Sequence, residues 1–306
     1  MLKEEVKNTK EYIVILFYKY ITIDNPEYLM ESEFAMCKIL DLKGRIIIAE
    51  EGINSTLEGT KENIEKYKLH IKSDKRFEGI DIKESSGTGN AFPKLSIKVR
   101  DEIVSTKLPK NIDPRKNTTR HINSTELKKW YEDKKNFVVV DMRNDYELNS
   151  GYFENTINIG LKNSRDLQDK IESLKIHKDK TIVTVCTGGV RCEKMSTYLV
   201  DQGFKDVQQL HNGMHAYMEK YPGENYLGTL YTFDQRVTMD FGGDKNGNRK
   251  VIGKCVDCNT SSETYYDIHD VDTKDSVRKK THHLIYCDKC AVANNVEKHA
   301  SRKDLY

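Results

Sequence analysis

The clearest fold signal in this sequence is the segment Asp179–Glu193, which reads DKTIVTVCTGGVRCE. Its first half, up to Cys186, is a β-branched run too continuously apolar for a strand with one face in water. A helix follows at once, because Met195, Tyr198 and Leu199 fall at i, i+3 and i+4. A buried strand that leads directly into a helix is typical of an α/β domain with a parallel sheet.

The neighbouring sequence extends this domain in both directions. Residues 136–141 (NFVVVD) form a second continuously apolar strand, and residues 164–174 and 193–202 have helical character, with Gly203 as a C-cap. Upstream, a short helix from Ser124 follows a proline-bearing polar segment, 106–123, which has the composition of an interdomain linker. We therefore predict a parallel α/β domain over residues 119–222.

The N-terminal third predicts a different fold. Strands are expected at 12–18, 45–49, 55–58 and 94–99, helices at 27–42 and 61–74, and turns at 51–54 and 85–90. The order β-α-β-β-α-β is that of a ferredoxin-like domain, which we place, with its basic linker, at residues 1–118. That fold hosts many unrelated functions and does not name one.

After Pro222 the apolar pattern weakens, and two Cys-x2-Cys pairs follow, Cys255 with Cys258 and Cys287 with Cys290, separated by 28 residues. Four thiolates at this spacing are able to hold a tetrahedral zinc ion, which would order a loop-rich segment and leave no open coordination position. Four free thiols or two disulfides are the alternatives. We predict a small cysteine-rich domain, residues 223–306, with a structural zinc.

Composition indicates how many domains the chain has and in which compartment it works. The chain has 306 residues with 50 basic and 48 acidic side chains, which suits two or three domains. No apolar run is long enough to span a bilayer, and the charged N-terminus does not resemble a secretory signal. An odd count of seven cysteines, four of them in Cys-x2-Cys pairs, favours a reducing compartment. We therefore expect a cytoplasmic protein without membrane contact.

Basic side chains concentrate in two segments. Residues 94–121 and residues 273–303 each carry eight Lys or Arg against three acidic side chains, a net charge of +5. Such segments are candidates for phosphate contacts, including Arg278–Lys280 between the cysteine pairs. The alternative is a solvated lysine-rich surface.

The loop after the central strand has the features of a reactive thiol site. Cys186 is placed at the carboxyl end of a strand and near a helix N-terminus, and both positions favour the thiolate. Gly188 and Gly189 permit successive N–H groups to curl toward one point, so the amides from Thr187 to Val190 predict an anion cradle, with Arg191 adding a cation. The alternative is an inert buried cysteine. Cys192 is either a resolving thiol for Cys186 or a small residue that starts the helix.

This loop resembles that of the rhodanese superfamily, in which a loop cysteine accepts sulfur as a persulfide. The spacing Cys-x4-Arg, from Cys186 to Arg191, differs from the Cys-x5-Arg of related phosphatases, and Val185 stands where those enzymes usually have His. The segment Asp141–Glu147 is similar to the rhodanese aspartate-and-arginine segment. The resemblance implies that Asp141 and Arg143 form a supporting ion pair beneath the loop.

A narrower resemblance covers nearly the whole chain and points to the rhodanese-like tRNA uridine(34) hydroxylases. It rests on four blocks in the same order: 44–54, 141–147, 186–194 and 233–237. Departures occur at Thr156-Ile157 and Arg120-His121, away from the loop. The resemblance implies hydroxylation of C5 of the wobble uridine to 5-hydroxyuridine, with molecular oxygen as co-substrate and Cys186 as catalytic thiol. A separate hypothesis is that a thiolate or persulfide at Cys186 is redox-active, or adds to C6 of the uracil and raises the electron density at C5.

Two other functions are compatible with the same residues. A sulfurtransferase that passes sulfane sulfur through a Cys186 persulfide is the main alternative, and an RNA-binding adaptor with an inactive loop is another. We see no nucleotide or flavin motif, and His211, His215 and Asp267 near His269 make no convincing iron site. The expected partner is the anticodon region of tRNA, with no DNA; the sequence carries no signal for an oligomeric state.

Overall fold

The computed structural model describes residues 10–242, 250–269 and 281–296. The chain divides into two compact units, one ending at Ile103 and the other beginning at Val104. No helix among these described residues is long and apolar enough to cross a membrane. The segment Arg278–Lys280 lies outside the described residues.

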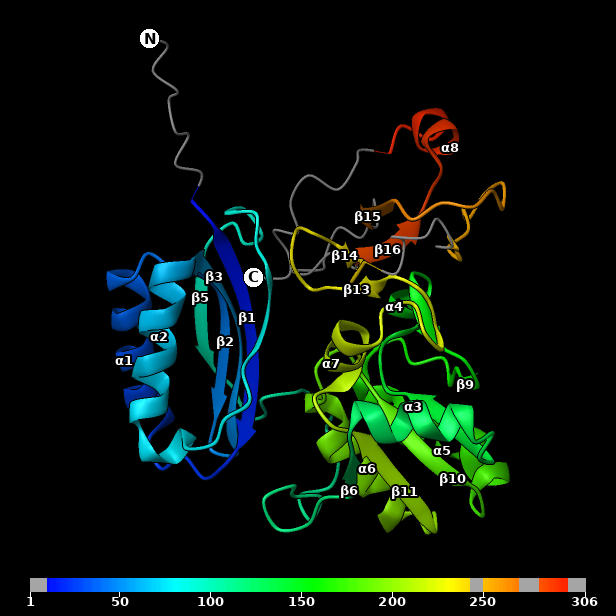
Figure 1. Cartoon of the computed structure of the whole chain (residues 1–306), viewed down its shortest axis with the longest axis horizontal. Coiled ribbons are helices and arrows are strands. Elements are labelled where there is room, and N and C mark those ends of the chain that lie inside the picture. Colours follow the sequence, from blue (N-terminus) through cyan, green and yellow to red (C-terminus); the bar gives the residue numbers. More distant parts are fainter. Residues whose placement is uncertain (1–9, 243–249, 270–280, 297–306) are drawn as a thin grey trace, which may run out of the picture. The chain divides into compact units, whose positions relative to one another are not determined.

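The first unit is a five-stranded sheet with two helices on one of its faces (Figure 1). Its elements are β1 (Tyr12–Tyr20), α1 (Pro26–Ile39), β2 (Lys43–Ala49), β3 (Gly52–Thr60), α2 (Lys61–Ser73), the 3-10 helix η1 (Lys75–Phe77), β4 (Lys83–Ser86) and β5 (Leu95–Val99). The strand order is β4-β1-β3-β2-β5. All neighbours are antiparallel except β2 and β5, which are parallel.

Local signals explain both helices. The Asn25 side chain accepts from the backbone N–H of Tyr28 at the start of α1, where Pro26 is the first helical residue. Thr60 caps α2 in the same way, accepting from Asn63 N–H at 3.3 Å. Apolar side chains of both helices pack on alternate residues of the sheet, such as Ile15 and Phe17, and form one core.

The predicted ferredoxin-like arrangement is confirmed, with two corrections. The fourth strand of that arrangement is β4, which we did not predict, because KESS is a short edge strand without apolar alternation. The predicted strand at 94–99 is instead the extra strand β5 at the opposite edge. The predicted turn at 51–54 is also wrong beyond its first residue, because β3 already begins at Gly52. A Cβ on Gly52 would lie 2.1 Å from the carbonyl oxygen of Lys19, so this first residue of β3 has to be glycine.

The second unit contains a parallel sheet, as predicted. It has five strands in the order β6-β11-β10-β7-β9. Its elements are β6 (Arg120–Ile122), α3 (Ser124–Glu132), β7 (Phe137–Asp141), α4 (Asp145–Leu148), β8 (Gly151–Phe153), β9 (Thr156–Ile157), the 3-10 helices η2 (Ser164–Asp166) and η3 (Lys175–His177), α5 (Leu167–Leu174), β10 (Thr181–Val185), α6 (Val190–Asp201), β11 (Asp206–Leu210) and α7 (Gly213–Lys220). Both faces of β10 are buried: Ile182 lies in one apolar cluster, and Val183 and Val185 lie in another.

The segment before β6 packs on this second unit. Ile112 is buried in its core, the Thr118 hydroxyl donates to the Glu193 carboxylate at 2.6 Å, and the Thr119 hydroxyl lies 2.8 Å from that of Ser196. The segment 106–123, expected to be a linker, therefore has fixed neighbours in the second unit, and its residues 120–122 form strand β6. The division of the chain into three domains remains a prediction.

The remaining elements are small antiparallel pairs: β12 (Tyr226–Gly228) with β8, β13 (Leu230–Tyr231) with β14 (Thr238–Met239), and β15 (Tyr265–His269) with β16 (Thr281–Ile285), followed by α8 (Asp288–Ala293). Strands β13, β15 and β16 pack against Tyr146 of α4 through a small apolar cluster around Tyr231, Tyr265 and Ile285. The Tyr265 hydroxyl donates to the carbonyl oxygen of Tyr146 at 2.8 Å. The cysteine-rich part is thus attached to the parallel domain at α4.

Candidate functional site

Cys186 lies at the junction that the sequence predicts, one residue after β10 and four residues before α6. Its side chain is fully buried. Gly189 ends the loop with a φ of 101°, a left-handed conformation that glycine adopts without strain. This turn directs the amides at the start of α6 back toward the sulfur.

Several donors converge on that sulfur. The N–H of Gly189 donates to Cys186 Sγ at 3.1 Å, and the backbone N–H groups of Arg191 and Cys192 help to stabilise its thiolate. Burial raises the pKa of the Cys186 thiol, but the Cys192 thiol, the Arg191 charge and these amides together lower it to about 6. At neutral pH Cys186 is therefore a buried thiolate held by a helix N-terminus.

The pKa of the Cys192 thiol is shifted in the opposite direction. Burial, together with the hydrogen bond and charge of Cys186, raises the pKa of its thiol well above the ordinary value. Cys192 is thus the proton donor of the pair and Cys186 the acceptor. Both are free cysteines in this structure, so the resolving role of Cys192 stays a prediction.

Arg191 has a partner that sequence reasoning missed. Its guanidinium forms a bidentate ion pair with Glu147 of α4, with N···O distances of 2.6 and 3.0 Å. It also donates to the Thr187 hydroxyl at 3.3 Å and lies 5.6 Å from the Phe233 ring centroid. The sequence places Glu147 in the segment 141–147, but it does not show that this side chain is buried or which residue it contacts. The cation is therefore fixed beside the sulfur rather than free at the rim.

Asp141 and Arg143 form a fully buried ion pair at the end of β7, with a shortest distance of 2.7 Å. Arg143 also donates to the carbonyl oxygen of Gly151 at 2.7 Å, which links β7 to β8. The two residues thus contact each other, and their role in supporting the loop stays a prediction.

A second missed element is the N-terminus of α7. The N–H groups of Met214 and His215 donate to the carbonyl oxygens of Cys186 and Thr187 at 2.9 and 3.0 Å. Gly213 sits at this contact with a φ of 66°, and a Cβ there would lie 2.5 Å from the Cys186 oxygen. Gly213 follows Asn212 in the sequence, an Asn-Gly pair that marks a turn, which could have drawn attention to it.

The histidines considered for iron have other surroundings. The His211 ring packs edge-on against His121, and the His215 ring against Phe241. Asp267 lies 2.6 Å from Nδ1 of His283. Among the described residues, these side chains do not form a metal-binding group.

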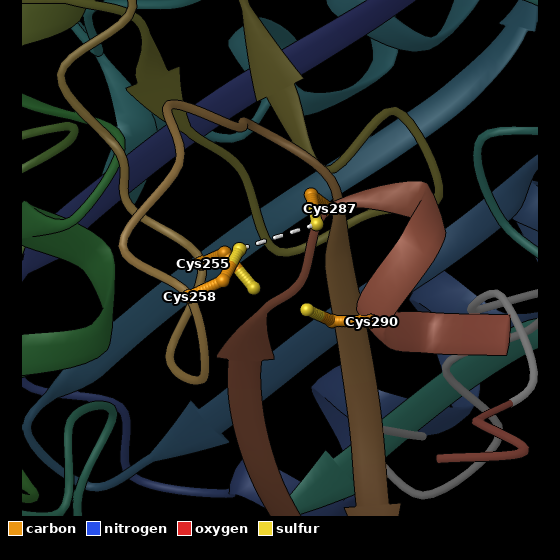
Figure 2. A group of neighbouring side chains, drawn as sticks. All are labelled: Cys255, Cys258, Cys287 and Cys290. Atoms are coloured by element: carbon orange, nitrogen blue, oxygen red, sulfur yellow. Dashed lines mark hydrogen bonds between the residues drawn. The ribbon is translucent and has the colours of Figure 1, made fainter. Parts of the chain in front are cut away.

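The four C-terminal cysteines do come together. Figure 2 shows Cys255 and Cys258 in one loop facing Cys287 and Cys290 at the start of α8. Their sulfur atoms all lie within 4.8 Å of one another, and Cys258 and Cys287 are 3.5 Å apart. A tetrahedral zinc with bonds of about 2.3 Å requires sulfurs about 3.8 Å apart, so the donor set and the spacing fit this ion.

The basic segment 94–121 divides between the two units. Arg115 and Arg120 are paired with Asp113 and Glu126, each at 2.8 Å. The pKa of Lys98 in β5 is lowered by burial and by the charges of Arg100, Lys94 and Arg45.

Comparison with known proteins identifies both parts of the chain. Residues 12–103 match the model of the UPF0176 acylphosphatase like domain, and residues 123–220 match that of the rhodanese-like domain. A rhodanese-like domain protein from Staphylococcus aureus, whose structure is known, is 32% identical to this chain. The match covers 32% of this chain and 91% of that protein, and its TM-score is 0.28, too low to support a structural argument.

Curated relatives extend the similarity over most of the chain. A tRNA uridine(34) hydroxylase of Staphylococcus aureus (strain Newman) is 42% identical over 79% of this chain and 76% of its own length. One of Staphylococcus carnosus is 41% identical over 80% and 77%, and one of Cytophaga hutchinsonii is 41% identical over 83% and 80%.

The fold and the thiolate loop define a rhodanese-like protein with an N-terminal acylphosphatase-like domain. The identity to curated relatives over most of the chain narrows this class. The chain belongs to the tRNA uridine(34) hydroxylase family.

Proposed function

We propose that the protein hydroxylates C5 of uridine 34 in tRNA to give 5-hydroxyuridine, with Cys186 as the essential thiol. The observation that supports this most directly is the Cys186 thiolate, with a pKa lowered to about 6, in a chain that belongs to the hydroxylase family. The anticodon region of tRNA is the expected substrate because unstacked loop bases can be turned out of the helix into a pocket.

The overall reaction replaces C5–H by C5–OH. Molecular oxygen as co-substrate supplies that oxygen atom, and its second atom leaves as water, which requires two electrons and two protons from an external donor. The thiolate would either serve as a redox-active group or add to C6 of the uracil and raise the electron density at C5. In both cases the Arg191–Glu147 pair keeps a cation beside the sulfur.

Two further features belong to this proposal. We propose that Cys255, Cys258, Cys287 and Cys290 bind a structural zinc, since four thiolates leave no coordination position for water. We also propose that the protein works in the cytoplasm, where tRNA and reduced thiols coexist.

The test is nucleoside mass spectrometry of tRNA from a host that lacks the gene. Complementation with the wild type or with Cys37→Ala, a buried cysteine of the first unit, is expected to restore 5-hydroxyuridine. Cys186→Ser should fail to restore it while the protein accumulates normally. Retention of the modification with Cys186→Ser would reject the thiol mechanism.

Sulfur transfer through a Cys186 persulfide is the second candidate, favoured by the match to the rhodanese-like domain. Transfer of sulfur from thiosulfate to cyanide measures it directly. If that activity is strong and depends on Cys186, while tRNA hydroxylation is absent even with the wild type, the protein is a sulfurtransferase.

A further inference from the structure

The turn between β13 and β14, residues 232–237, brings an aromatic ring to the reactive loop. Strand β13 packs against α4, the helix that carries Glu147 (Figure 1). From this turn the Phe233 ring reaches the Arg191 guanidinium, whose central carbon lies 5.6 Å from the ring centroid. Phe233 is therefore a direct neighbour of the cation that stabilises the Cys186 thiolate.

The buried carboxylate of Asp234 holds this turn together. Its Oδ1 accepts hydrogen bonds from the Thr232 hydroxyl at 3.2 Å, from the backbone N–H of Arg236 at 3.0 Å and from Nε of Arg236 at 2.8 Å. Its Oδ2 accepts from Nη2 of Arg236 at 2.6 Å. The N–H of Thr232 also donates to the carbonyl oxygen of Val237 at 2.8 Å, which closes the turn at its two ends. The shape of the turn is thus fixed by its own hydrogen bonds.

The last residue of the turn has a strained backbone. The φ of Val237 is 65°, in the left-handed region, which a β-branched residue adopts only against steric resistance. Its side chain packs in the same apolar cluster as Phe233, Tyr231 and Tyr146. Strain of this kind persists where the surrounding structure imposes it, and it concentrates at functional sites. The strain at Val237 therefore points to a function for the shape of this turn.

The Phe233 ring supplies a contact that the other partners of Arg191 do not. The hydrogen bonds from Arg191 to Glu147 and to the Thr187 hydroxyl lie in the plane of the guanidinium, because all of its N–H bonds lie in that plane. The cation lies over the face of the Phe233 ring, an arrangement that attracts a cation without any hydrogen bond. The ring and the in-plane partners together fix where the charge stands.

The position of that charge matters for the sulfur. Arg191 is buried, and a charge that is shielded from water acts more strongly on a neighbouring thiolate. The charged groups that act on Arg191 are Glu147, Cys186 and Arg143. Phe233 adds no charge of its own, so its removal changes only the position and the hydration of the guanidinium.

We propose that Phe233 is a positioning residue for the Cys186 thiolate, and that the turn 232–237 holds its ring against Arg191. Phe233 acts through Arg191, whose charge stabilises the thiolate. Without the ring, water reaches the guanidinium and the charge acts less strongly on the sulfur. This inference rests on Cys186 being the reactive thiol of the proposed function. It adds a segment from outside the parallel sheet to the machinery of the loop.

The first experiment follows the thiolate of the full-length protein by its ultraviolet absorbance, with the signal of the same variant carrying Cys186→Ser subtracted. Phe233→Leu keeps apolar bulk but removes the ring, and the midpoint should rise by about 0.5 pH units, the scale of one cation–aromatic contact. Phe233→Tyr keeps the ring and should restore the wild-type midpoint. A midpoint of Phe233→Leu equal to that of the wild type, even with lowered thermal stability, would overturn the proposal, because the ring would then only fill space.

The second experiment tests the turn that carries the ring. Asp234→Asn removes the charge that binds Arg236 and should raise the midpoint in the same direction as Phe233→Leu. The matched control is Asp113→Asn, because Asp113 binds the backbone N–H and the guanidinium of Arg115 in the same pattern, two residues along the chain. The control should leave the midpoint unchanged. Equal shifts in the two variants, or no shift in Asp234→Asn, would show that the turn does not position the ring.

Turnover separates this inference from the proposed function. The kcat of Phe233→Leu for tRNA hydroxylation should be about twofold below that of the wild type near pH 6 and equal to it near pH 8, with an unchanged KM. Wild-type protein that does not hydroxylate tRNA, together with a shifted midpoint in Phe233→Leu, would reject the proposed function and keep the positioning role. Wild-type protein that hydroxylates tRNA with the same midpoint and pH profile as Phe233→Leu would reject the positioning role alone.

Discussion

Burial and hydrogen bonding act in opposite directions on the Cys186 thiol. A buried thiol without donors is inert, as Cys37 illustrates: burial and the nearby Glu33 raise its pKa. Cys186 is equally buried, yet its pKa is lowered to about 6 by the donors and the cation that surround it. The difference between an inert and a reactive cysteine in this chain therefore lies in the Cys192 thiol, the Arg191 charge and the backbone N–H groups beside the sulfur.

We expect the Cys186 thiolate to titrate with a midpoint near pH 6. Ultraviolet thiolate absorbance of the wild type minus that of Cys186→Ser measures it. Because the folded pKa lies below the unfolded value, this group adds stability above the unfolded pKa that is lost as the pH falls toward 6. The free energy of unfolding of the wild type should thus gain on that of Cys186→Ser from pH 6 to 9. A midpoint near 9 would contradict the proposed cradle.

Glu147→Gln should destabilise the protein by about 3 kcal/mol, because it leaves the buried Arg191 charge without its partner. Urea denaturation measures the loss. The matched control is Glu172→Gln, whose carboxylate pairs with Lys175 but is 72% exposed and should contribute below about 1 kcal/mol. Similar losses in both variants would show that the Glu147–Arg191 pair is not structurally important.

At the level of elements, three segments meet at the loop: the end of β10, the start of α6 and the start of α7. The first two are adjacent in sequence, and their apolar patterns predict them correctly. The third enters through hydrogen bonds from Met214 and His215 to loop carbonyl groups. Such a contact between segments distant in sequence has no local pattern, which is why Gly213 escaped prediction.

Gly213→Ala should disturb this junction, because a Cβ would lie 2.5 Å from the Cys186 oxygen and 2.7 Å from the Gly189 nitrogen. We expect the thiolate midpoint to rise from near 6 toward that of an ordinary thiol, along with a loss of stability. Gly203→Ala is the control: its φ is also positive, at 83°, but its nearest neighbour is the flexible end of Lys178 at 3.5 Å. It should cost about 1–2 kcal/mol and leave the midpoint unchanged. An unshifted midpoint in Gly213→Ala would show that α7 does not set the loop geometry.

For the whole molecule, the cysteine cluster and the thiolate loop share α4 as a common neighbour. Tyr265 of the C-terminal hairpin hydrogen bonds to the backbone of Tyr146, and the next residue, Glu147, binds Arg191. Ordering of the hairpin by the cluster is therefore able to affect the support of the loop.

The metal content of the purified protein tests the proposed zinc site. The purified chain should hold about one zinc per molecule, and Cys258→Ser should lose most of it together with part of its thermal stability. Cys37→Ser, which changes a cysteine of the first unit, should keep the metal. Absence of stoichiometric zinc from wild-type protein that was purified without chelators would contradict the metal site.

Apolar periodicity and glycine positions predict the parallel domain, the ferredoxin-like arrangement and the place of Cys186 between strand and helix. All three features depend on residues that are close together in the chain. The pairing of Asp141 with Arg143 is instead implied by the resemblance to the rhodanese superfamily. Three features became visible only in the folded protein: β4, not β5, completes the ferredoxin-like order, Glu147 holds Arg191, and α7 supports the loop. Edge pairing, buried ion pairs and backbone contacts between distant segments depend on which surfaces meet after folding, and no local pattern of side chains records that.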